Sequence, residues 1–263
     1  MSFHSAVNSS QVLAGKVGLV TGIANDQSIA FGCARALHDA GASLAVTYLN
    51  EKARRYVEPL ARAVAAELFL PLDVRETQQM ATVFAAVREK WGRLDFLIHS
   101  LAFAPKADLQ GRLVDSSREG FLAAVDISCH SFVRMARLAE PLMTDGGVLV
   151  TMSYYGAEKV VPNYGLMGPV KAALEAAVRY LAFELGPKAI RVHAVSPGPL
   201  KTRAASGIAN FNDLLTEAEQ CAPERDLVDI FDVGATTAFL CSPLAKLITG
   251  GTIYVDGGYN ICG

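Results

Sequence analysis

Short runs of apolar and β-branched residues alternate with helical patterns along most of the 263-residue chain. Strands are expected at residues 16–22, 43–49, 67–74, 94–102, 147–153, 190–198 and 252–258. Helices are expected at 28–40, 51–66, 76–91, within 117–143 and near 168–185. Several strands are almost wholly apolar, as burial on both faces of a sheet requires. The alternation predicts an α/β fold: a single-domain, Rossmann-type, doubly wound parallel sheet of about seven strands with helices on both faces.

The longest insertion follows the sixth predicted strand and covers about residues 199–231, with helical stretches of its own. Ligands of doubly wound sheets bind outside the carboxyl ends of the strands, and this segment leaves from one such end. We expect it to be a substrate-covering lid within one catalytic domain over 1–263, in which residues 1–14 form an N-terminal tail.

Composition excludes several classes of partner. The 24 Lys and Arg residues nearly balance 26 Asp and Glu, so the net charge of −2 provides no field for nucleic acid or an anionic membrane. Five cysteines occur without a CxxC pair or a Cys/His cluster, which predicts reduced thiols and no metal site. No signal-peptide pattern is present, and no apolar run reaches the ~18 residues of a membrane span. We expect a soluble cytoplasmic protein.

The first predicted strand runs into "TGIANDQSIAFG", residues 21–32, which opens a helix. A helix N-terminus after a strand can receive a pyrophosphate, so we expect a dinucleotide-binding domain. Gly22 would make the turn, Ser28 would cap the helix and bond a phosphate oxygen, and Ala30 and Gly32 would allow close packing of helix on sheet. The spacing is not G-x-G-x-x-G, and an ordinary strand-to-helix turn is the alternative.

The ends of the next two predicted strands bear on the adenosine half of the cofactor. Asp73-Val74 could bond the adenine amino group, although a merely polar strand end is equally compatible. Leu49-Asn50 supplies neither the acid that binds ribose hydroxyls nor the base that pairs with a 2′-phosphate. Glu51 opposes a phosphate, and the basic residues that follow fit the solvated face of a helix: Lys52, Arg54 and Arg55. We therefore favour NADH over NADPH.

Five segments carry a resemblance to a known family: "TGIANDQSIAFG", "HSLAFAP", "SYYGAEKVVPNYGLMGPVKAALEAAVRYLAFELGP", "RVHAVSPGPLKTRAASGI" and "VDGGY". Together, from about residue 15 to 259, they resemble the enoyl-acyl-carrier-protein reductases of bacterial type II fatty-acid synthesis, a divergent branch of the short-chain dehydrogenase/reductases. The resemblance implies an oxidoreductase that reduces the trans-2 double bond of enoyl thioesters with NADH. It also implies an acyl-carrier-protein or CoA substrate and a homotetramer.

In that family the catalytic tyrosine precedes a lysine by seven positions, which here matches Tyr164 and Lys171. Tyr154 matches the second active-site tyrosine, where an ordinary short-chain dehydrogenase has serine. Met167 stands where such an enzyme has its tyrosine. The displacement has a chemical reason, because hydride reaches the β-carbon of an enoyl thioester while negative charge develops on the carbonyl oxygen. The donor must reach that oxygen, and Lys171 can hold the nicotinamide ribose hydroxyls and stabilise the charge.

Tyr155 and Lys159 have the four-residue spacing of the ordinary short-chain dehydrogenase signature. Both lie in a segment with Gly156 and "VVPN", which predicts loop residues at the rim of the pocket. Lys171 instead belongs to the apolar helix "VKAALEAAVRYLAFEL", with Pro169 in its first turn. We therefore assign the chemistry to Tyr164 and Lys171, and leave open whether Tyr154 assists the donor or bounds the acyl pocket.

The predicted site comprises two further sets of residues. The cofactor contacts are Gly22, Ile23, Ala24, Ser28, Ile29, Leu49, Asp73, Val74, Ser100, Leu101, Ala102, Lys171, Pro199, Leu200 and Thr202. The substrate contacts are Ala102, Phe103, Tyr154, Tyr164, Met167, Ala204, Ala205, Ile208 and Phe211.

Three positions depart from the family pattern. After "SGI", where many members carry basic residues that meet the acidic carrier protein, the run 209–213 has none, and Lys201 and Arg203 compensate only in part. Ala102 replaces a glycine beside the nicotinamide, which predicts weaker binding of diphenyl-ether inhibitors. Leu49 replaces a common glutamine and removes a possible adenosine contact.

Two other functions remain open on the sequence. The altered lid is compatible with a reductase of the same fold that acts on another enone or a carbonyl. The missing basic residues are compatible with a non-catalytic NAD-binding paralogue, although the full set of tyrosines and lysine argues against it. The apolar helix beyond Lys171 fits burial against a second copy as well as plain core packing.

Overall fold

The computed structural model describes residues 11–202 and 211–262, and in them seven strands form one sheet. The strand order is β3-β2-β1-β4-β5-β6-β7, and every neighbouring pair is parallel. The strands are β1 Val17–Thr21, β2 Ser43–Tyr48, β3 Leu68–Pro71, β4 Phe96–His99, β5 Gly147–Met152, β6 Ile190–Pro197 and β7 Thr252–Val255. The doubly wound parallel sheet expected from the alternation is confirmed.

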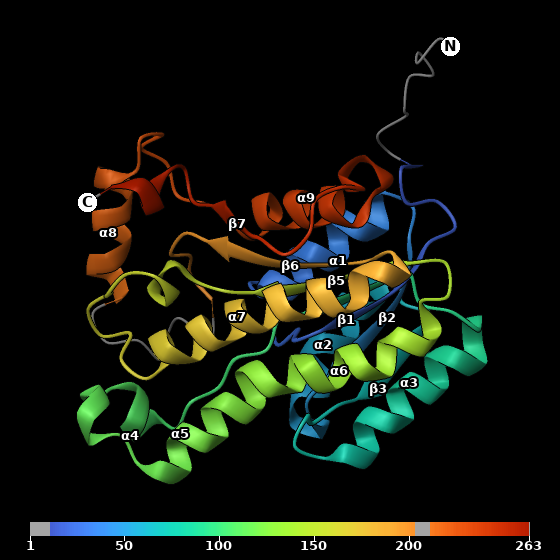
Figure 1. Cartoon of the computed structure of the whole chain (residues 1–263), viewed down its shortest axis with the longest axis horizontal. Coiled ribbons are helices and arrows are strands. Elements are labelled where there is room, and N and C mark those ends of the chain that lie inside the picture. Colours follow the sequence, from blue (N-terminus) through green and yellow to red (C-terminus); the bar gives the residue numbers. More distant parts are fainter. Residues whose placement is uncertain (1–10, 203–210, 263) are drawn as a thin grey trace.

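Helices cover both faces of this sheet. They are α1 Ile29–Asp39, α2 Glu51–Ala63, α3 Thr77–Trp91, α4 Lys106–Leu109, α5 Arg118–Val125, α6 Ser131–Ala139, α7 Met167–Leu185, α8 Phe211–Cys221 and α9 Ile230–Cys241. In Figure 1, α3, α6 and α7 cross the front of the sheet, and their buried side chains share one apolar core. Buried side chains of α1, α2 and α9 form a second core with the sheet. The strands contribute apolar side chains to both cores, which explains why their sequences are almost wholly apolar.

The helix expected within 117–143 differs in detail from the prediction. Five residues, Asp126–His130, form a π-helical turn between α5 and α6. Just after it, the Ser131 hydroxyl donates to the Ile127 carbonyl at 2.7 Å and lies 2.7 Å from Nε2 of the buried His99 ring. Side-chain bonds of this kind compete with the regular helical ladder, and π-turns are common at functional sites. The short helix α4 was not expected from the sequence.

A crossing of two helices corrects the role expected for Gly32. A Cβ on Gly32 would lie 2.0 Å from the carbonyl oxygen of Ile230, and one on Gly234 would lie 2.4 Å from the carbonyl oxygen of Gly32. Gly32 therefore permits close approach of α1 to α9 rather than of α1 to the sheet. The pattern could not reveal this partner because α9 lies about two hundred residues further along the chain.

Two expected segments are only partly described. The tail over residues 1–14 is described from Gln11 onward, and the lid over 199–231 lacks a description of 203–210. In the described part of the lid, α8 packs with Leu214, Leu215 and Ala218 buried. Asp229 then starts α9 with a capping box, accepting from the amides of Phe231 and Asp232. In the described ranges, no helix combines the length and the apolarity needed to cross a bilayer.

The contact of α1 with α9 generates a prediction about stability. Gly32→Ala places a methyl group against the backbone of Ile230, which cannot rotate away. We expect the free energy of unfolding, measured by urea denaturation, to fall by about 2 kcal/mol or more. Gly186→Ala is the control, because a Cβ there meets nothing within 4 Å. Equal stability of the two variants would contradict the close crossing.

Candidate active site

Most of the predicted site residues follow four strands that are neighbours in the sheet: β1, β4, β5 and β6. Parallel strands bring their carboxyl ends to one edge, and the segments after these ends form the candidate site. Gly22 follows β1, Ser100 follows β4, Tyr154 follows β5, and Pro199 and Leu200 follow β6. Only the fold unites these segments, which lie far apart in the sequence.

The turn after β1 fits the backbone cradle expected for a pyrophosphate. Gly22 has a φ of +102°, and a Cβ there would lie 2.0 Å from the carbonyl oxygen of Ser100. Any side chain at this position would therefore break the contact between the ends of β1 and β4. Helix α1 then begins at Ile29 with no acidic side chain in its first turn, which suits an anionic group. Ile23 is buried, while Ala24 and Ile29 are half-buried beside this turn.

Ser28 does not act as expected. It is the N-cap residue of α1, but its side chain makes no capping hydrogen bond. Its Oγ instead accepts from the amides of Ala24 and Asn25, at 3.0 and 3.1 Å, and donates to Asn25 Oδ1. The hydroxyl therefore fixes the shape of the turn from within. The helical pattern could not distinguish a cap from such a local loop bond.

The residues after β2 and β3 would form the adenosine end. Leu49 is 53% exposed and Val74 is buried. Both carboxylate oxygens of Asp73 accept from the Arg75 guanidinium, which lowers the pKa of Asp73. Any bond between Asp73 and an adenine amino group would share the carboxylate with Arg75, a residue that the sequence reasoning did not single out.

Arg54 and Arg55, which follow β2, are engaged locally. Arg54 lies 3.5 Å from Glu51 and 3.7 Å from Glu58, and its guanidinium lies over the Tyr48 ring. Arg55 donates to the Tyr56 hydroxyl. The Glu51 carboxylate also accepts from the Tyr48 hydroxyl at 3.3 Å, so a negative charge is fixed near the end of β2.

The loop after β4 carries the residues predicted beside the nicotinamide. Ser100 and Leu101 are half-buried, whereas Ala102 and Phe103 are exposed. The buried Ser128 hydroxyl accepts from the Phe103 amide at 2.9 Å and donates to the Phe103 carbonyl at 3.1 Å. Ser128 lies in the π-turn, so this irregular element anchors the loop. The sequence reasoning missed Ser128, because nothing in its local pattern marks a contact 25 residues away.

The segment after β6 closes the same end of the site. Pro199 and Leu200 are buried, and Thr202 is half-buried. The hydroxyl of Ser196, near the end of β6, is buried without a hydrogen-bond partner among the described residues. A buried hydroxyl of this kind can receive a ligand group. With the Gly22 cradle and the acid-free start of α1, it makes the site compatible with a dinucleotide.

Tyr154 and Tyr164 lie against each other, with ring centroids 4.8 Å apart and an interplanar angle of 61°. Gly156 permits this pairing, because a Cβ there would lie 2.5 Å from the Tyr164 ring and 3.3 Å from the Tyr154 ring. The Tyr154 hydroxyl is buried without a partner among the described residues. Burial is the main cause that raises the pKa of both phenols, so both keep their protons at neutral pH. Two neutral hydrogen-bond donors therefore lie side by side.

Lys171 lies in the first turns of α7 and is buried. Its Nζ donates to the carbonyl oxygen of Met152, at the end of β5, over 2.7 Å. Burial lowers the pKa of Lys171 to about 8, while Cys129 and Glu175 oppose that shift. Lys171 is therefore present in both its charged and its neutral form slightly above physiological pH.

Tyr155 and Lys159 occupy a different environment. Tyr155 begins a short 3-10 turn and packs its ring 5.3 Å from that of Tyr259. Lys159 is exposed, with its Nζ 3.5 Å from the carbonyl oxygen of Cys262. This lysine thus points toward the C-terminal segment, whereas Lys171 is held inside the molecule.

Most of the substrate residues that can be placed gather in one apolar cluster, whereas Ala102 and Phe103 are exposed outside it. Tyr154, Tyr164 and Met167 belong to the core on the α7 side of the sheet, and Leu101 and Phe211 pack against it. Met167 is buried at the first position of α7, with no polar group to offer there. The predicted contacts Ala204, Ala205 and Ile208 lie outside the described residues.

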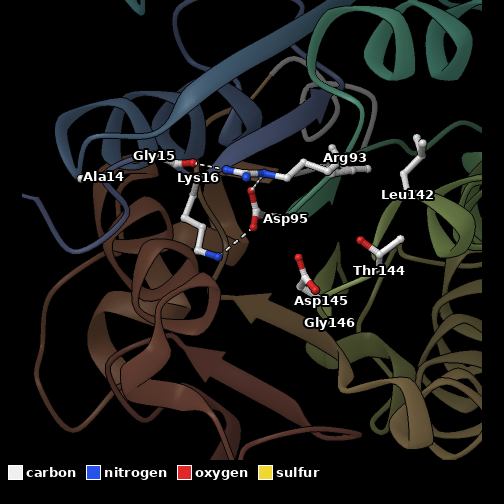
Figure 2. Close-up of a pocket in the computed structure, with 10 residues that line it drawn as sticks. Ala14, Gly15, Lys16, Arg93, Asp95, Leu142, Thr144, Asp145 and Gly146 are labelled. Carbon is white, nitrogen blue, oxygen red and sulfur yellow. Dashed lines mark hydrogen bonds and ion pairs between the residues drawn. The ribbon is translucent and has the colours of Figure 1, made fainter.

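A pocket at the opposite edge of the sheet does not belong to this site. Its lining residues precede β1, β4 and β5, and Figure 2 shows the Asp95 carboxylate between Lys16 and Arg93. Asp95 is 2.8 Å from Lys16 Nζ and 3.3 Å from Arg93 Nε, and it also accepts from the amide of Val17. These bonds hold the starts of β1 and β4 together, so the cluster has a structural role.

Comparison with known proteins agrees with this geometry. The family described as "Enoyl-(Acyl carrier protein) reductase" matches residues 22–260. The enoyl-acyl-carrier-protein reductase (NADH) FabI of Nostoc sp. is 50% identical over 254 residues, covering 95% of this chain and 98% of that relative. The enoyl-acyl-carrier-protein reductase structure of Anaplasma phagocytophilum, in complex with NAD, has a TM-score of 0.93 at 46% identity and 97% coverage of both chains.

A second solved structure is similar to the same degree. The Bacillus cereus enoyl-acyl carrier protein reductase, with NADP+ and indole naphthyridinone, has a TM-score of 0.94 at 45% identity, covering 96% of this chain and 99% of that one. The family match and these identities extend over nearly the whole chain. The chain therefore belongs to the enoyl-acyl-carrier-protein reductase family.

Proposed function

We propose that the protein reduces the trans-2 carbon–carbon double bond of enoyl thioesters with NADH in type II fatty-acid synthesis. The observation that carries the proposal is the placement of the phenols. Tyr154 and Tyr164 pair inside the apolar cluster near the end of β5, while the buried position 167 holds methionine. A donor displaced in this way suits charge that develops away from the carbon receiving hydride.

The residues of the chain divide the work of such a reduction. NADH would supply the hydride to the β-carbon when bound, and one proton taken up at the α-carbon would complete the saturated thioester. Tyr164 donates a hydrogen bond to the thioester carbonyl oxygen, and its raised pKa keeps that proton in place at neutral pH. Lys171 holds the nicotinamide ribose hydroxyls and adds positive charge beside the developing enolate. Tyr154 supplies a second donor or bounds the acyl chain, and the apolar cluster excludes water.

The proposed preference for NADH is supported by the surroundings of β2. Arg54 is paired with two carboxylates, and Glu51 places negative charge beside the expected ribose position. A 2′-phosphate would meet this carboxylate, which disfavours its binding. The similarity to a Bacillus cereus reductase that carries NADP+ makes this preference worth measuring directly.

The natural acyl carrier and the assembly belong to the same proposal. The substrate would be an acyl-carrier-protein or CoA thioester, covered by the lid of residues 199–231. Within this lid α8 carries acidic but no basic side chains, which does not favour an acidic carrier there. We propose a single catalytic domain that acts in the cytoplasm as a homotetramer. Exposed Tyr180 and Phe183 on α7 support burial of this helix against a second copy.

Replacement of the donor tests the assignment of Tyr164. With NADH and a crotonyl or longer trans-2-enoyl thioester, Tyr164→Phe should lower kcat about 100-fold, because one donor to the oxyanion is lost. Tyr155→Phe is the matched control and should leave kcat near the wild-type value. The rate of NADH oxidation measures both. Equal losses in the two variants would contradict the assignment, and absence of wild-type turnover on CoA and carrier-protein thioesters of every chain length would refute the proposed function.

The charge of Lys171 predicts a pH dependence. Burial favours the neutral amine, so the ammonium is lost at about pH 8, well below the range of an exposed lysine. If the ammonium is required, kcat/KM is full below this pKa and falls as the pH rises through it. Lys171→Met should have low activity without this alkaline limb. A wild-type profile that stays level to about pH 10 would contradict the role of the charge.

Ala102 predicts altered inhibition. Its methyl group narrows the approach to the nicotinamide loop, so diphenyl-ether inhibitors should bind more weakly than is usual for the family. Ala102→Gly should tighten inhibition about tenfold, which corresponds to about 1.4 kcal/mol of binding free energy. Inhibition constants in the presence of NAD+ measure the effect, and tight binding to the wild type would show the prediction wrong.

A further inference from the structure

Glu175 is a buried acid that the proposed mechanism does not use. It lies in α7 four positions after Lys171, so both side chains project from the same face of the helix. Its side chain is almost wholly buried, with 4% of the residue exposed. A buried carboxyl in an apolar core is unfavourable unless its oxygens receive hydrogen bonds, so its partners indicate its role.

The partners of Glu175 are at the end of β5 and in β7. The Ser153 hydroxyl donates to Glu175 Oε1 at 2.5 Å, and Thr252 provides a second side-chain hydrogen bond. Ser153 is itself buried, and its amide donates to the carbonyl of Val195. The carboxyl therefore joins α7 to two strands that flank β6 in the sheet.

Lys171 and Glu175 form hydrogen bonds with two consecutive residues, Met152 and Ser153. Lys171 Nζ binds the carbonyl of Met152, and Glu175 binds the side chain of Ser153, directly before Tyr154. The two bonds together fix both the distance and the rotation of this segment relative to α7. They add to the bond from the Ser153 amide to the Val195 carbonyl, so the segment that leads into Tyr154 is held both by the sheet and by α7.

The charge of Glu175 also affects the pKa values of the proposed catalytic groups. It raises the pKa of Lys171 against the effect of burial, together with Cys129, and Lys171 in turn lowers the pKa of the buried His99. Burial raises the pKa of the Glu175 carboxyl itself, the hydrogen bonds from Ser153 and Thr252 lower it, and Glu158 and Arg179 act in opposite directions. Glu175 also raises the pKa values of Tyr164 and Tyr254.

We propose that Glu175 is a positioning residue, which fixes the Met152–Tyr154 segment against α7 through its hydrogen bond with Ser153. This inference rests on the proposed function for its effect on turnover. The effect of Glu175 on Lys171 can be measured without turnover, because the pH dependence of NADH affinity depends on the charge of the lysine.

Glu175→Gln tests the proposal with little change in shape. The amide keeps an acceptor oxygen for Ser153 but removes the negative charge beside Lys171. We expect kcat with a trans-2-enoyl thioester to fall about tenfold or more, and the alkaline limb of kcat/KM to move to lower pH by about one unit. The pH at which the affinity for NADH, measured by its fluorescence, begins to weaken should move in the same direction.

Two further variants separate charge from shape. Glu184→Gln removes the same charge from an exposed position of α7 and should leave both pH profiles unchanged. Ser153→Ala removes the contact but keeps the acidic side chain of Glu175, so it should lower kcat. Thermal unfolding of each variant shows whether it is folded at the assay temperature.

The measurements on Glu175→Gln, Glu184→Gln and Ser153→Ala can each contradict the proposal. Wild-type kcat and pH profile in Glu175→Gln, or an equal shift in Glu184→Gln, would overturn it. If Glu175→Gln does not fold, wild-type kcat in Ser153→Ala would overturn the positioning role. If the wild type reduces no enoyl thioester, the proposed function fails, whereas the pH dependence of NADH affinity still tests the link between Glu175 and Lys171.

Discussion

The hydrogen bond from Lys171 to the carbonyl of Met152 ties the long helix α7 to the interior strand β5. A primary amine is buried to make it, and this burial lowers the pKa of Lys171 to about 8. The same contact places α7 close to the end of β5, where the rings of Tyr154 and Tyr164 meet. The ionisation of the lysine and the packing of the phenols are therefore both linked to the contact between α7 and the end of β5.

The rest of the fold supplies rigid surroundings for that interaction. Gly32 and Gly234 let α1 and α9 pack backbone to backbone on one face, and α3, α6 and α7 share the core on the other. At the site edge, Gly22 brings the end of β1 against Ser100 after β4. Because protein interiors are close-packed, these contacts leave the loops after the strands few alternative positions.

Much of the fold could be predicted because its signals are local: apolar strands, helical periodicity and a glycine turn each lie within a few residues. The differences arise where a side chain bonds a distant segment or its own loop, outside any periodic pattern. The π-turn after α5 accompanies bonds of Ser128 and Ser131 to Phe103 and His99. Asp73 is engaged by Arg75, and Ser28 binds its own loop rather than capping α1. No periodic pattern records such partners, so sequence reasoning missed Ser128 and Ser131 and gave simpler roles to Asp73 and Ser28.

The sequence by itself determined the parallel α/β architecture and distinguished two tyrosine–lysine pairs by the segments in which they lie. Burial periodicity and chain order suffice for the architecture, since both act through neighbouring residues, whereas the pairing of Tyr164 with Lys171 came from the resemblance to a family. Only the tertiary structure decided that Lys159 faces the C-terminal segment while Lys171 is desolvated, and that Glu175 reaches Ser153. Desolvation and hydrogen bonding between distant segments depend on where the helices pack, and that position exists only once the whole sheet has formed.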